Sequence, residues 1–429
     1  MKVLLINYTD AGGGAAIAAL RLVTALNEHG VYARLGVTDK RTCSPYSFVL
    51  PQKRHFVFYR FFAKTLRFLR RLSKLFFKCI PNPFKFRTSN KILHSTNFYS
   101  ETDIDWINKS DFDIVNLHWI IGTICNKDIA KIKKPIVWTM HDSWPCCGAE
   151  HHPNLLENDT RWKEGYLRHN KPQSTRGFDI CRKVCNQKKR YLSNKNIVFT
   201  APSNWEHDIL NSSALFGTHE CTVIPNIVDH TVFCHKDKNT LREAFNIPKN
   251  KIVLGFGAAY DIDDPKSMKG SFYLIEAFKK ISNPEDYFLV IFGPAGAAFT
   301  SKVSIPFFAS GYISNPNILA CLYSVCDCII NPSLIENLPT TCLEALFCGV
   351  PSVAFDVGGT SDIVVHKKTG WLATPYNDEE LATGIEWCSE HNEELSKNCF
   401  VKAKNDFDTN KIINDYISVY SDAIKQNNR

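Results

Sequence analysis

The chain has 429 residues, of which 44% are hydrophobic and 22% charged, and its formal net charge is +8. A chain of this length exceeds one ordinary hydrophobic core, so we expect two domains. Residues 53–91 carry twelve basic and no acidic residues, so the rest of the chain has a net charge of −4 (8 minus 12), which argues against a nucleic acid partner. Sixteen cysteines lie largely in apolar runs and predict reduced thiols in a cytoplasmic protein.

The first predicted strand, KVLLINY at residues 2–8, is a continuous apolar run of the kind buried on both faces of a parallel sheet. That run is too short for a signal peptide or a membrane span. It leads into Gly12, Gly13 and Gly14, which precede a predicted helix. Glycines let the backbone approach a ligand closely, and a helix start favours a phosphate. The alternative is an ordinary strand-to-helix turn, because the dinucleotide fingerprint G-x-G-x-x-G is absent.

Residues 53–91 interrupt the alternation of strands and helices. A basic stripe recurs at steps of four and three, with phenylalanine and leucine filling the other positions. Such a pattern is typical of an amphipathic helix on an anionic membrane surface. A helix packed on its own domain with a solvated basic face is the alternative, but the lack of acidic residues favours the membrane. The stripe consists of Arg60, Lys64, Arg67, Arg71, Lys74 and Lys78.

Two further predicted strands end in polar side chains. The run DIVNLHWIIG carries His118 at its end, and KPIVWTMHDSW carries His141 and Asp142. Ligands of open α/β sheets bind at the carboxyl ends of strands, so these side chains are candidate site residues. A single histidine there is more often structural, but two on successive strand ends favour a site.

Residues 143–190 form a loop-rich region with several cysteines and histidines. Such side chains could supply a tetrahedral zinc site, but their spacing is less regular than a CxxC pair. We therefore expect no metal and keep a structural zinc as the alternative. Its ligands would be Cys147, His151, Cys181 and Cys185.

The second half begins after a charged, apolar-poor linker at residues 234–248. The strand KIVLGFGAAY is followed by Lys266 and Lys269, with Gly270 opening a helix. A lysine at a helix start is well placed to neutralise a diphosphate. The acidic run between this strand and the lysines suggests a metal site. Its place in a loop beside lysines predicts solvated carboxylates instead. That run contains Asp261, Asp263 and Asp264.

The stretch 328–365 contains a buried strand, a loop NPSLIENLP, a short helix TTCLEALFC, a second strand and the turn at Gly358 and Gly359. Glu336 lies in the loop that leaves the carboxyl end of the strand. Glu344 lies about one turn into the helix, whose first N–H groups, exposed after Pro339, can face an anion. Two carboxylates beside an anion site suit a sugar nucleotide.

The order PSLIEN, LEA, CGVP and diglycine turn resembles the donor-binding segment of the retaining GT-B glycosyltransferases, the glycogen-synthase-like group known as glycosyltransferase family 4. The resemblance implies an α/β fold of two Rossmann-like doubly wound parallel-sheet domains facing an interdomain cleft. We expect an acceptor-side domain at 1–233, the linker at 234–248 and a donor-binding domain at 249–405. A final helix at 406–429 is expected to return to the first domain.

The same resemblance implies roles for individual residues. It assigns catalysis to His118, Glu336 and Lys269, with Glu336 holding sugar hydroxyls and Glu344 holding the ribose. The acceptor side would contain His118, His141 and Asp142. Lys269 matches the family's lysine, whereas Lys266 is the less certain second cation. The donor-binding set is Gly13, Gly14, Lys266, Lys269, Asn337, Leu338, Pro339, Thr340 and Glu344.

The predicted function is retaining, metal-independent sugar transfer from a nucleotide sugar to a glycan acceptor, without a cofactor. An acceptor linked to lipid, in the synthesis of a surface polysaccharide, follows from the basic segment at 53–91 and the family. The protein would then lie on the inner face of the membrane. The alternatives are a GT-B nucleotide-sugar epimerase, a glycan phosphorylase, and a non-catalytic membrane-associated binding protein.

Overall fold

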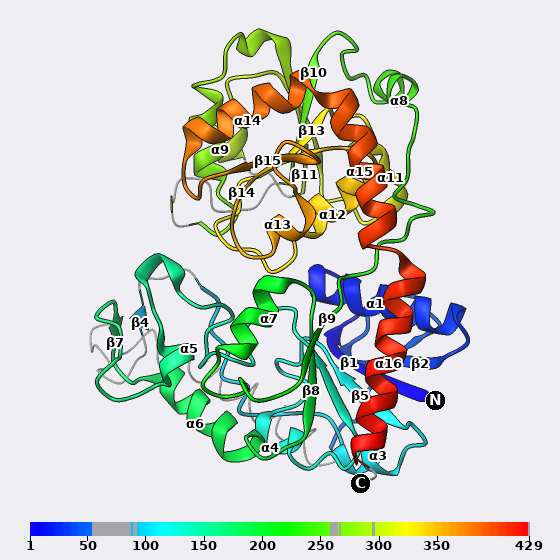
Figure 1. The fold of residues 1–429 in the computed structure, drawn as a ribbon, viewed down its shortest axis with the longest axis vertical. Helices are drawn as coiled ribbons and strands as arrows, with labels where there is room; N and C mark the ends of the chain where they lie inside the picture. The colour runs from blue at the N-terminus through cyan, green and yellow to red at the C-terminus, as the bar shows by residue number, and fades with distance from the viewer. Residues whose placement is uncertain (54–86, 89–91, 258–264, 266, 294–296, 428–429) are drawn as a thin grey trace, which may run out of the picture. The chain divides into compact units, whose positions relative to one another are not determined.

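The computed structural model describes residues 1–53, 87–88, 92–257, 265, 267–293 and 297–427. Two compact units make up the chain (Figure 1). Unit 1 contains Met1–Ala201, His207–Thr222 and Tyr416–Arg429, and unit 2 contains Pro202–Glu206 and Val223–Asp415.

Unit 1 is built on a seven-stranded sheet in the order β3-β2-β1-β5-β6-β8-β9, parallel from β3 to β8. Residues in β5, β6 and β8 are buried throughout, which explains why these strands are apolar runs without alternation. The strands are β1 (Lys2–Thr9), β2 (Tyr32–Asp39), β3 (Ser47–Val49), β5 (Ile114–Leu117), β6 (Ile136–Thr139), β8 (Ile197–Ala201) and β9 (Cys221–Val223).

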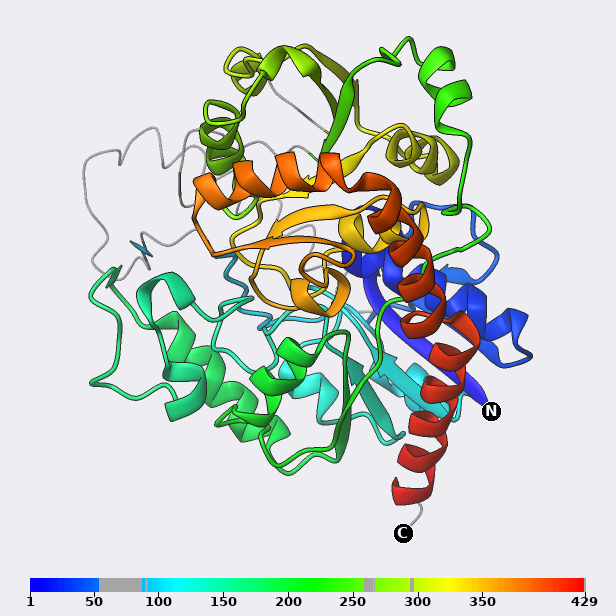
Figure 2. The same cartoon turned by 45° about the horizontal axis from the view of Figure 1, so that its top comes forward.

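Helices surround this sheet in both views (Figures 1 and 2). The side chain of Asp103 caps the start of α3 by accepting hydrogen bonds from two backbone N–H groups, and Asp179 caps α6 by accepting one. A small antiparallel pair, β4 (Arg87–Thr88) with β7 (Thr175–Arg176), lies apart from the main sheet. The helices are α1 (Gly14–Glu28), α3 (Ile104–Lys109), α4 (Asn126–Ile129), η1 (Leu155–Glu157), α5 (Arg161–Glu164), α6 (Ile180–Leu192) and α7 (Asn204–Asn211), which belongs to unit 1 from His207 onward.

The last helix, α16 (Thr409–Asn427), contributes its residues from Tyr416 onward to unit 1. There the amide of Asn116, at the centre of the sheet, donates to the hydroxyl of Tyr420 at 2.6 Å. Both side chains are fully buried, so this hydrogen bond satisfies two polar groups in the core.

Unit 2 is built on a six-stranded parallel sheet in the order β12-β11-β10-β13-β14-β15. Val253 and Leu254, neighbours on β10, belong to different core clusters. Successive side chains of a strand point to opposite faces, so the sheet has an apolar core on each side. The strands are β10 (Ile252–Gly257), β11 (Tyr287–Phe292), β12 (Phe307–Gly311), β13 (Cys328–Asn331), β14 (Ser352–Phe355) and β15 (Gly370–Ala373).

The helices of unit 2 cover these two cores. Residues of α11 and α12 pack in one core, and residues of α9 and α14 pack in the other. Residues 234–248, read from the sequence as a linker, contain the helix α8. The helices are α8 (Lys238–Ala244), α9 (Ser271–Phe278), η2 (Pro284–Asp286), α10 (Ala297–Thr300), α11 (Pro316–Ser324), α12 (Thr340–Phe347), α13 (Thr360–Ile363), α14 (Asp378–Glu390) and α15 (Asn392–Asp406).

The predicted fold class is confirmed, because both units contain a doubly wound parallel sheet. In each sheet the strand order reverses beside the first strand of the unit, between β1 and β5 and between β10 and β13. Ligands of such sheets bind at the carboxyl ends of the strands at this switch point. The two switch points therefore direct attention to the segments after β1, β5, β10 and β13.

The basic helix predicted within residues 53–91 lies outside the described residues. At the ends of that range, Lys53 pairs with the buried carboxylate of Asp128 at 2.5 Å, and Arg87 belongs to β4. Among the described cysteines none is paired in a disulfide. None of the described helices has the length and apolar content needed to cross a bilayer.

Candidate active site

The switch point of unit 1 begins with the glycine loop after β1. Gly13 is the N-cap of α1, and no side chain caps the helix there. A Cβ added to Gly13 would meet nothing within 4 Å, so the helix start faces open space. Unsatisfied N–H groups and the helix dipole make such a start suitable for a phosphate. The predicted donor residues Gly13 and Gly14 therefore occupy a feature with the required chemistry.

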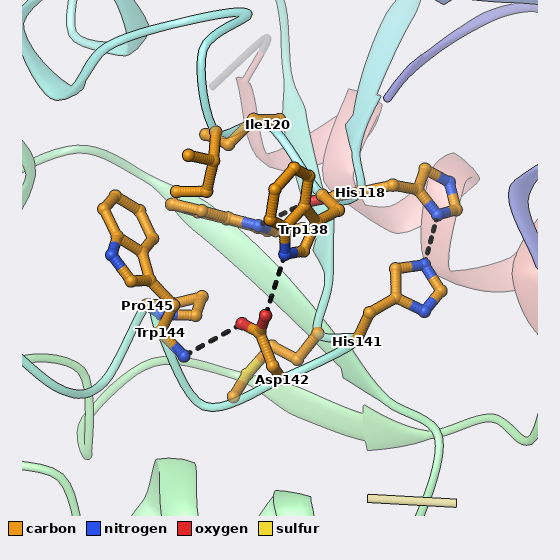
Figure 3. A pocket seen from close by; sticks show the side chains of 10 residues that line it. His118, Ile120, Trp138, His141, Asp142, Trp144 and Pro145 are labelled. Carbon is orange, nitrogen blue, oxygen red and sulfur yellow. Dashed lines mark hydrogen bonds between the residues drawn. The ribbon is translucent and has the colours of Figure 1, made fainter. Parts of the chain in front are cut away.

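His118 follows β5 at the same edge of the sheet. Its backbone N–H donates to the carbonyl of Ile6 on β1 at 2.9 Å. Its Nδ1 shares a hydrogen bond of 2.8 Å with Nε2 of His141, and the two rings stack with centroids 5.0 Å apart (Figure 3). Burial lowers the pKa of His118 well below its usual value and lowers the pKa of His141 to about 4. Both rings are therefore neutral at pH 7, and one proton lies between them.

The remaining ring nitrogen of His118 has a different environment. Nε2 is buried and has no hydrogen-bond partner within the described part of the chain. A buried polar atom without a partner costs free energy unless a ligand or water satisfies it. His118 is thus oriented by His141 and offers one nitrogen to a ligand.

Asp142, the third predicted acceptor-side residue, is engaged by the protein itself. Its Oδ2 accepts from the indole N–H of Trp119 at 2.9 Å and from Nδ1 of His151 at 2.6 Å. Its Oδ1 accepts from the backbone N–H of Trp144 at 3.0 Å. Burial alone would raise the pKa of Asp142, but His151 and the hydrogen bonds hold it below its usual value. Nε2 of His151 then bonds to Ser95 Oγ at 2.8 Å. Asp142 therefore organises the loops around the site.

These side chains line one small pocket at the carboxyl end of β5 and β6, and Figure 3 shows His118, His141 and Asp142 around it. Its other walls are mostly apolar and aromatic. The structure thus brings the three predicted acceptor-side residues together. The lining consists of His118, Trp119, Ile120, Ile121, Trp138, Met140, His141, Asp142, Trp144 and Pro145.

A buried cation supports this pocket, and the sequence analysis missed it. Lys188 on α6 is fully buried, and its ammonium donates to the carbonyls of Trp144, Cys147 and Gly148. It also lies 3.5 Å from the ring centroid of Trp144, which lines the pocket. Burial lowers the pKa of Lys188 to about 8. Lysines 188 and 189 and Arg190 are consecutive, and such a basic run carries no signal that one of its members is buried.

Among the described residues, the four members of the alternative zinc site do not form a group that could share one ion; they are Cys147, His151, Cys181 and Cys185. Both ring nitrogens of His151 are used by Asp142 and Ser95. Within the described residues, ligand atoms close enough to share one ion belong to His94, Glu150 and Cys181, and only Cys181 comes from the predicted set.

Glu150 in that group is already paired with a buried cation. It accepts from Arg161 at 3.0 Å and from the hydroxyl of Tyr166 at 3.2 Å. Burial raises the pKa of the Cys181 thiol, with Glu150 adding to the effect, so the thiol keeps its proton. Arg161, Tyr166 and Cys181 therefore surround Glu150 in one hydrogen-bonded network.

In unit 2, Lys269 and Glu336 form an ion pair of 2.6 Å at the switch point. The carboxylate of Glu336 raises the pKa of Lys269. Gly270 and Gly358 allow this arrangement, because both have positive φ angles of 63° and 58°. A Cβ on Gly270 would lie 1.7 Å from the carbonyl oxygen of Pro332, and one on Gly358 would lie 1.6 Å from that of Glu336. Two close backbone contacts therefore bring the predicted cation and carboxylate together.

The helix α12 supplies the second carboxylate. It starts after Pro339 without a side-chain cap, so its first N–H groups remain suited to an anion. Glu344 is buried, and its Oε2 accepts from the hydroxyl of Tyr323 at 3.0 Å. Burial raises the pKa of Tyr323, and Glu344 adds to the effect. Tyr323 on α11 therefore fixes the orientation of Glu344, a role that sequence spacing did not reveal.

The loop between Glu336 and α12 contains the remaining predicted donor residues. The side chain of Asn337 accepts a hydrogen bond from Ser203 at 2.9 Å. Leu338 packs in a core of unit 2, so only its backbone is suited to a polar ligand. Thr340 is the first residue of α12. The predicted second cation, Lys266, lies outside the described residues.

The sequence is similar to known glycosyltransferases. Residues 237–406 match the family described as Glycosyl transferases group 1. The chain is similar to N-acetyl-alpha-D-glucosaminyl L-malate synthase of Bacillus anthracis, with 24% identity over 55% of this chain and 62% of the relative. It is also similar to the putative teichuronic acid biosynthesis glycosyltransferase TuaC of Bacillus subtilis, with 32% identity over 27% of this chain and 29% of the relative. The chain thus spans less than two thirds of the length of these relatives.

Solved structures share the fold over nearly the whole chain. Anabaena HepE, solved in complex with UDP-glucose, has a TM-score of 0.63 and 17% identity, covering 98% of this chain and all of that one. Sucrose-phosphate synthase from Thermosynechococcus elongatus has a TM-score of 0.67 and 15% identity, covering 99% of each chain. The chain therefore has the GT-B fold, and its residues 237–406 are similar to the domain of the family described as Glycosyl transferases group 1.

Proposed function

We propose that this protein transfers a sugar, with retention and without a metal ion, from a nucleotide sugar to a glycan acceptor. The observation that carries the proposal is the pairing of Lys269 with Glu336 at the switch point of the family domain. A cation beside a carboxylate at an uncapped helix start can hold a diphosphate and a sugar hydroxyl at the same time. Anabaena HepE, which shares the fold, was solved with UDP-glucose, and this supports a nucleotide-sugar donor.

On the donor side, charge grows on the departing diphosphate as the glycosidic bond breaks. Lys269 and the start of α12 would stabilise that charge in place, which is usually the largest contribution to catalysis in such sites. The glycine loop at Gly13 and Gly14 would supply further N–H groups, and Lys266 a second cation. When the phosphate binds Lys269, the carboxylate of Glu336 becomes available to a sugar hydroxyl.

Each of the other donor residues has a distinct partner on the nucleotide sugar. Glu344, held by Tyr323, would accept hydrogen bonds from the ribose hydroxyls. The backbone from Asn337 to Thr340 would contact the transferred sugar. These contacts order the donor before reaction, so less entropy is lost in the transition state.

Retention does not require a nucleophilic side chain in this scheme. The acceptor hydroxyl attacks on the face from which the diphosphate leaves, and the departing phosphate oxygen takes its proton. His118, neutral and oriented by His141, would bond through Nε2 to a sugar hydroxyl. Asp142 would keep the pocket in shape.

We further propose that the acceptor is lipid-linked and belongs to a surface polysaccharide, and that the enzyme works at the inner face of the cytoplasmic membrane. The basic composition of residues 53–91 supports an anionic surface as a partner. The similarity to TuaC, named for teichuronic acid biosynthesis, supports a surface polymer as the product.

A donor screen tests the proposal directly. The purified protein is heated with UDP-, GDP-, ADP- and TDP-sugars, and the stabilising donor is then incubated with candidate acceptors. We expect one donor to raise the melting temperature, since a ligand that binds only the folded state stabilises it. The product should keep the anomeric configuration of the donor, as read by NMR coupling constants.

Three outcomes would contradict the proposal. Conversion of the donor without any acceptor would indicate an epimerase, and phosphate-dependent release of a sugar phosphate from a glycan would indicate a phosphorylase. Absence of stabilisation by every nucleotide sugar would indicate a non-catalytic binding protein.

A further inference from the structure

The helix α6 has two faces with different surroundings. Its inner face is buried and carries Lys188, which holds the loop of the His118 pocket. Its outer face lines a separate open groove of about 690 Å³ in unit 1. The groove is lined in part by Lys171, Phe178, Arg182, Lys183, Arg190 and Tyr191.

Among the described residues, the basic side chains of this groove form no ion pair with a carboxylate; these side chains are Lys171, Arg182, Lys183 and Arg190. Asp179 is the one acidic residue of the lining, and its Oδ1 already accepts from the backbone N–H of Arg182 at 3.0 Å and from Arg161 at 3.5 Å. Four cations therefore face one groove with a single, occupied carboxylate.

Aromatic rings accompany these cations. The ammonium of Lys183 lies 5.2 Å from the ring centroid of Phe98 and 5.6 Å from that of Phe178. The side chain of Phe178 is 48% exposed although it is large and apolar. The guanidinium of Arg190 lies 5.5 Å from the ring centroid of Tyr191. The groove therefore offers flat apolar surfaces beside positive charge.

This combination selects a class of ligand. Like charges within about 8 Å repel each other at physiological salt, and an anion in the groove removes that repulsion. Guanidinium groups bind carboxylates and phosphates with directed hydrogen bonds. The exposed rings suit the apolar C–H faces of sugar rings, and a groove suits a chain better than it suits a flat bilayer.

We propose that the groove along α6 binds an anionic glycan, a chain bearing carboxylate or phosphate groups. It would hold the acceptor polymer away from the reacting end, and this assignment of the acceptor class rests on the proposed function. The carbonyl of Trp144, which Lys188 binds, connects the same helix to the His118 pocket. Occupation of the outer face would therefore steady the helix that supports the pocket.

The test measures binding alone, without donor and without transfer. Oligogalacturonates are titrated into the full chain by calorimetry, with uncharged maltooligosaccharides of equal length as the comparison. The double variant Arg182→Gln and Arg190→Gln should bind the anionic oligomer at least about tenfold more weakly, because two charge-assisted contacts are lost. Phe178→Ala should weaken binding less, and added salt should weaken binding to the wild type.

Lys189→Gln is the matched control, because Lys189 is an exposed cation on the same helix that does not line the groove. It should bind like the wild type, and thermal melting of each variant verifies folding. Lys183→Gln serves as the second variant if the double variant does not fold.

Equal affinity of the double variant and the wild type, or equal binding of charged and neutral oligomers, would overturn the proposal. The proposal would also be overturned if the variants kept their affinity for the oligomer and lost only their binding to vesicles of anionic phospholipid. The groove would then face a membrane. Stabilisation by nucleotide sugars is measured separately, so a failed groove leaves the proposed transfer reaction open.

Discussion

The Lys269–Glu336 region of unit 2 and the His118 pocket of unit 1 are built in different ways. In unit 2, glycines let two loops touch through their backbones, and the ion pair follows from that contact. In unit 1, buried side chains hold one another through hydrogen bonds, from His118 through His141 and from Asp142 through His151. The unit 2 region depends on the absence of side chains at its glycines, which leaves room for the backbones to touch. The unit 1 pocket depends on hydrogen bonds between polar groups in a low-dielectric interior. Substitutions should therefore damage the two regions by different routes.

The largest effect is expected at Gly358. Gly358→Ala would place a Cβ 1.6 Å from the carbonyl oxygen of Glu336, at a positive φ. The loop must shift, so the free energy of unfolding should fall by at least ~3 kcal/mol in denaturant titrations, and donor binding should be lost.

Gly311→Ala is the matched control, because Gly311 also has a positive φ but open space around its Cβ position. Its cost should be only the strain of a left-handed residue, about 1 kcal/mol. Equal losses at the two positions would show that backbone crowding does not define the Glu336 region.

Lys188→Met tests the polar design of unit 1. Three backbone carbonyls would lose their buried donor, so the free energy of unfolding at pH 7 should fall by about 3 kcal/mol. Transfer should weaken as the loop at Trp144 loosens, although donor stabilisation should stay unchanged. Lys189→Met, one residue along and exposed, should change neither quantity.

The lowered pKa of Lys188 gives this variant a second signature. The folded protein releases the Lys188 proton near pH 8, whereas the unfolded chain keeps it to about the ordinary 10.5. The unfolded state therefore binds more protons between these values, and wild-type stability should rise with pH across that window. A similar rise in Lys188→Met would contradict the assignment.

His141→Phe keeps a ring beside His118 but removes its hydrogen-bond partner. Transfer should fall by about tenfold because His118 loses its orientation. The pKa of His141 is about 4 in the folded state against an ordinary 6.5, so wild-type stability falls as pH drops from 6.5 to 4. Over this pH range the free energy of unfolding of the variant should fall less than that of the wild type, and the difference should be on the order of 1 kcal/mol per pH unit. The same change at exposed His169 should leave the transfer rate as in the wild type.

The smallest effect is expected at Tyr323. Tyr323→Phe removes one hydrogen bond to Glu344 and should cost about 1 to 2 kcal/mol of stability. If Glu344 holds the ribose, a 2′-deoxyribose donor should bind the variant and the wild type with similar affinity, whereas the normal donor should lose affinity. Equal losses for both donors would remove Glu344 from the ribose site.

The two regions also differ in how much of them the sequence predicts. The Glu336 region is almost contiguous, so its loop, helix start and diglycine turn are visible as a motif between residues 328 and 365. The ends of apolar strands likewise predicted the positions of His118 and His141. Both kinds of pattern, apolar strand runs and glycine turns, involve residues that are close in the sequence. A single sequence displays such local patterns directly.

The partners of these residues were not predictable in the same way. Lys188 is 44 residues from Trp144 and sits in a basic run that looks solvated. Ser95 lies 56 residues from His151, and the pairing of His151 with Asp142 occupies a ring nitrogen that the alternative zinc set would use. Such contacts depend on the register of packed elements, and a list of cysteines and histidines does not contain that information.

The most direct test of the central claim is the transfer rate of Glu336→Gln, measured with the donor found in the screen. Glu243→Gln is the control, because Glu243 forms an exposed ion pair with Lys249 in the same unit. We expect the Glu336 variant to fold normally and to lose at least about a hundredfold in rate, as for other removed electrostatic contacts to a transition state. The control should transfer at the wild-type rate. Full transfer by a folded Glu336→Gln protein would contradict the assignment of this site.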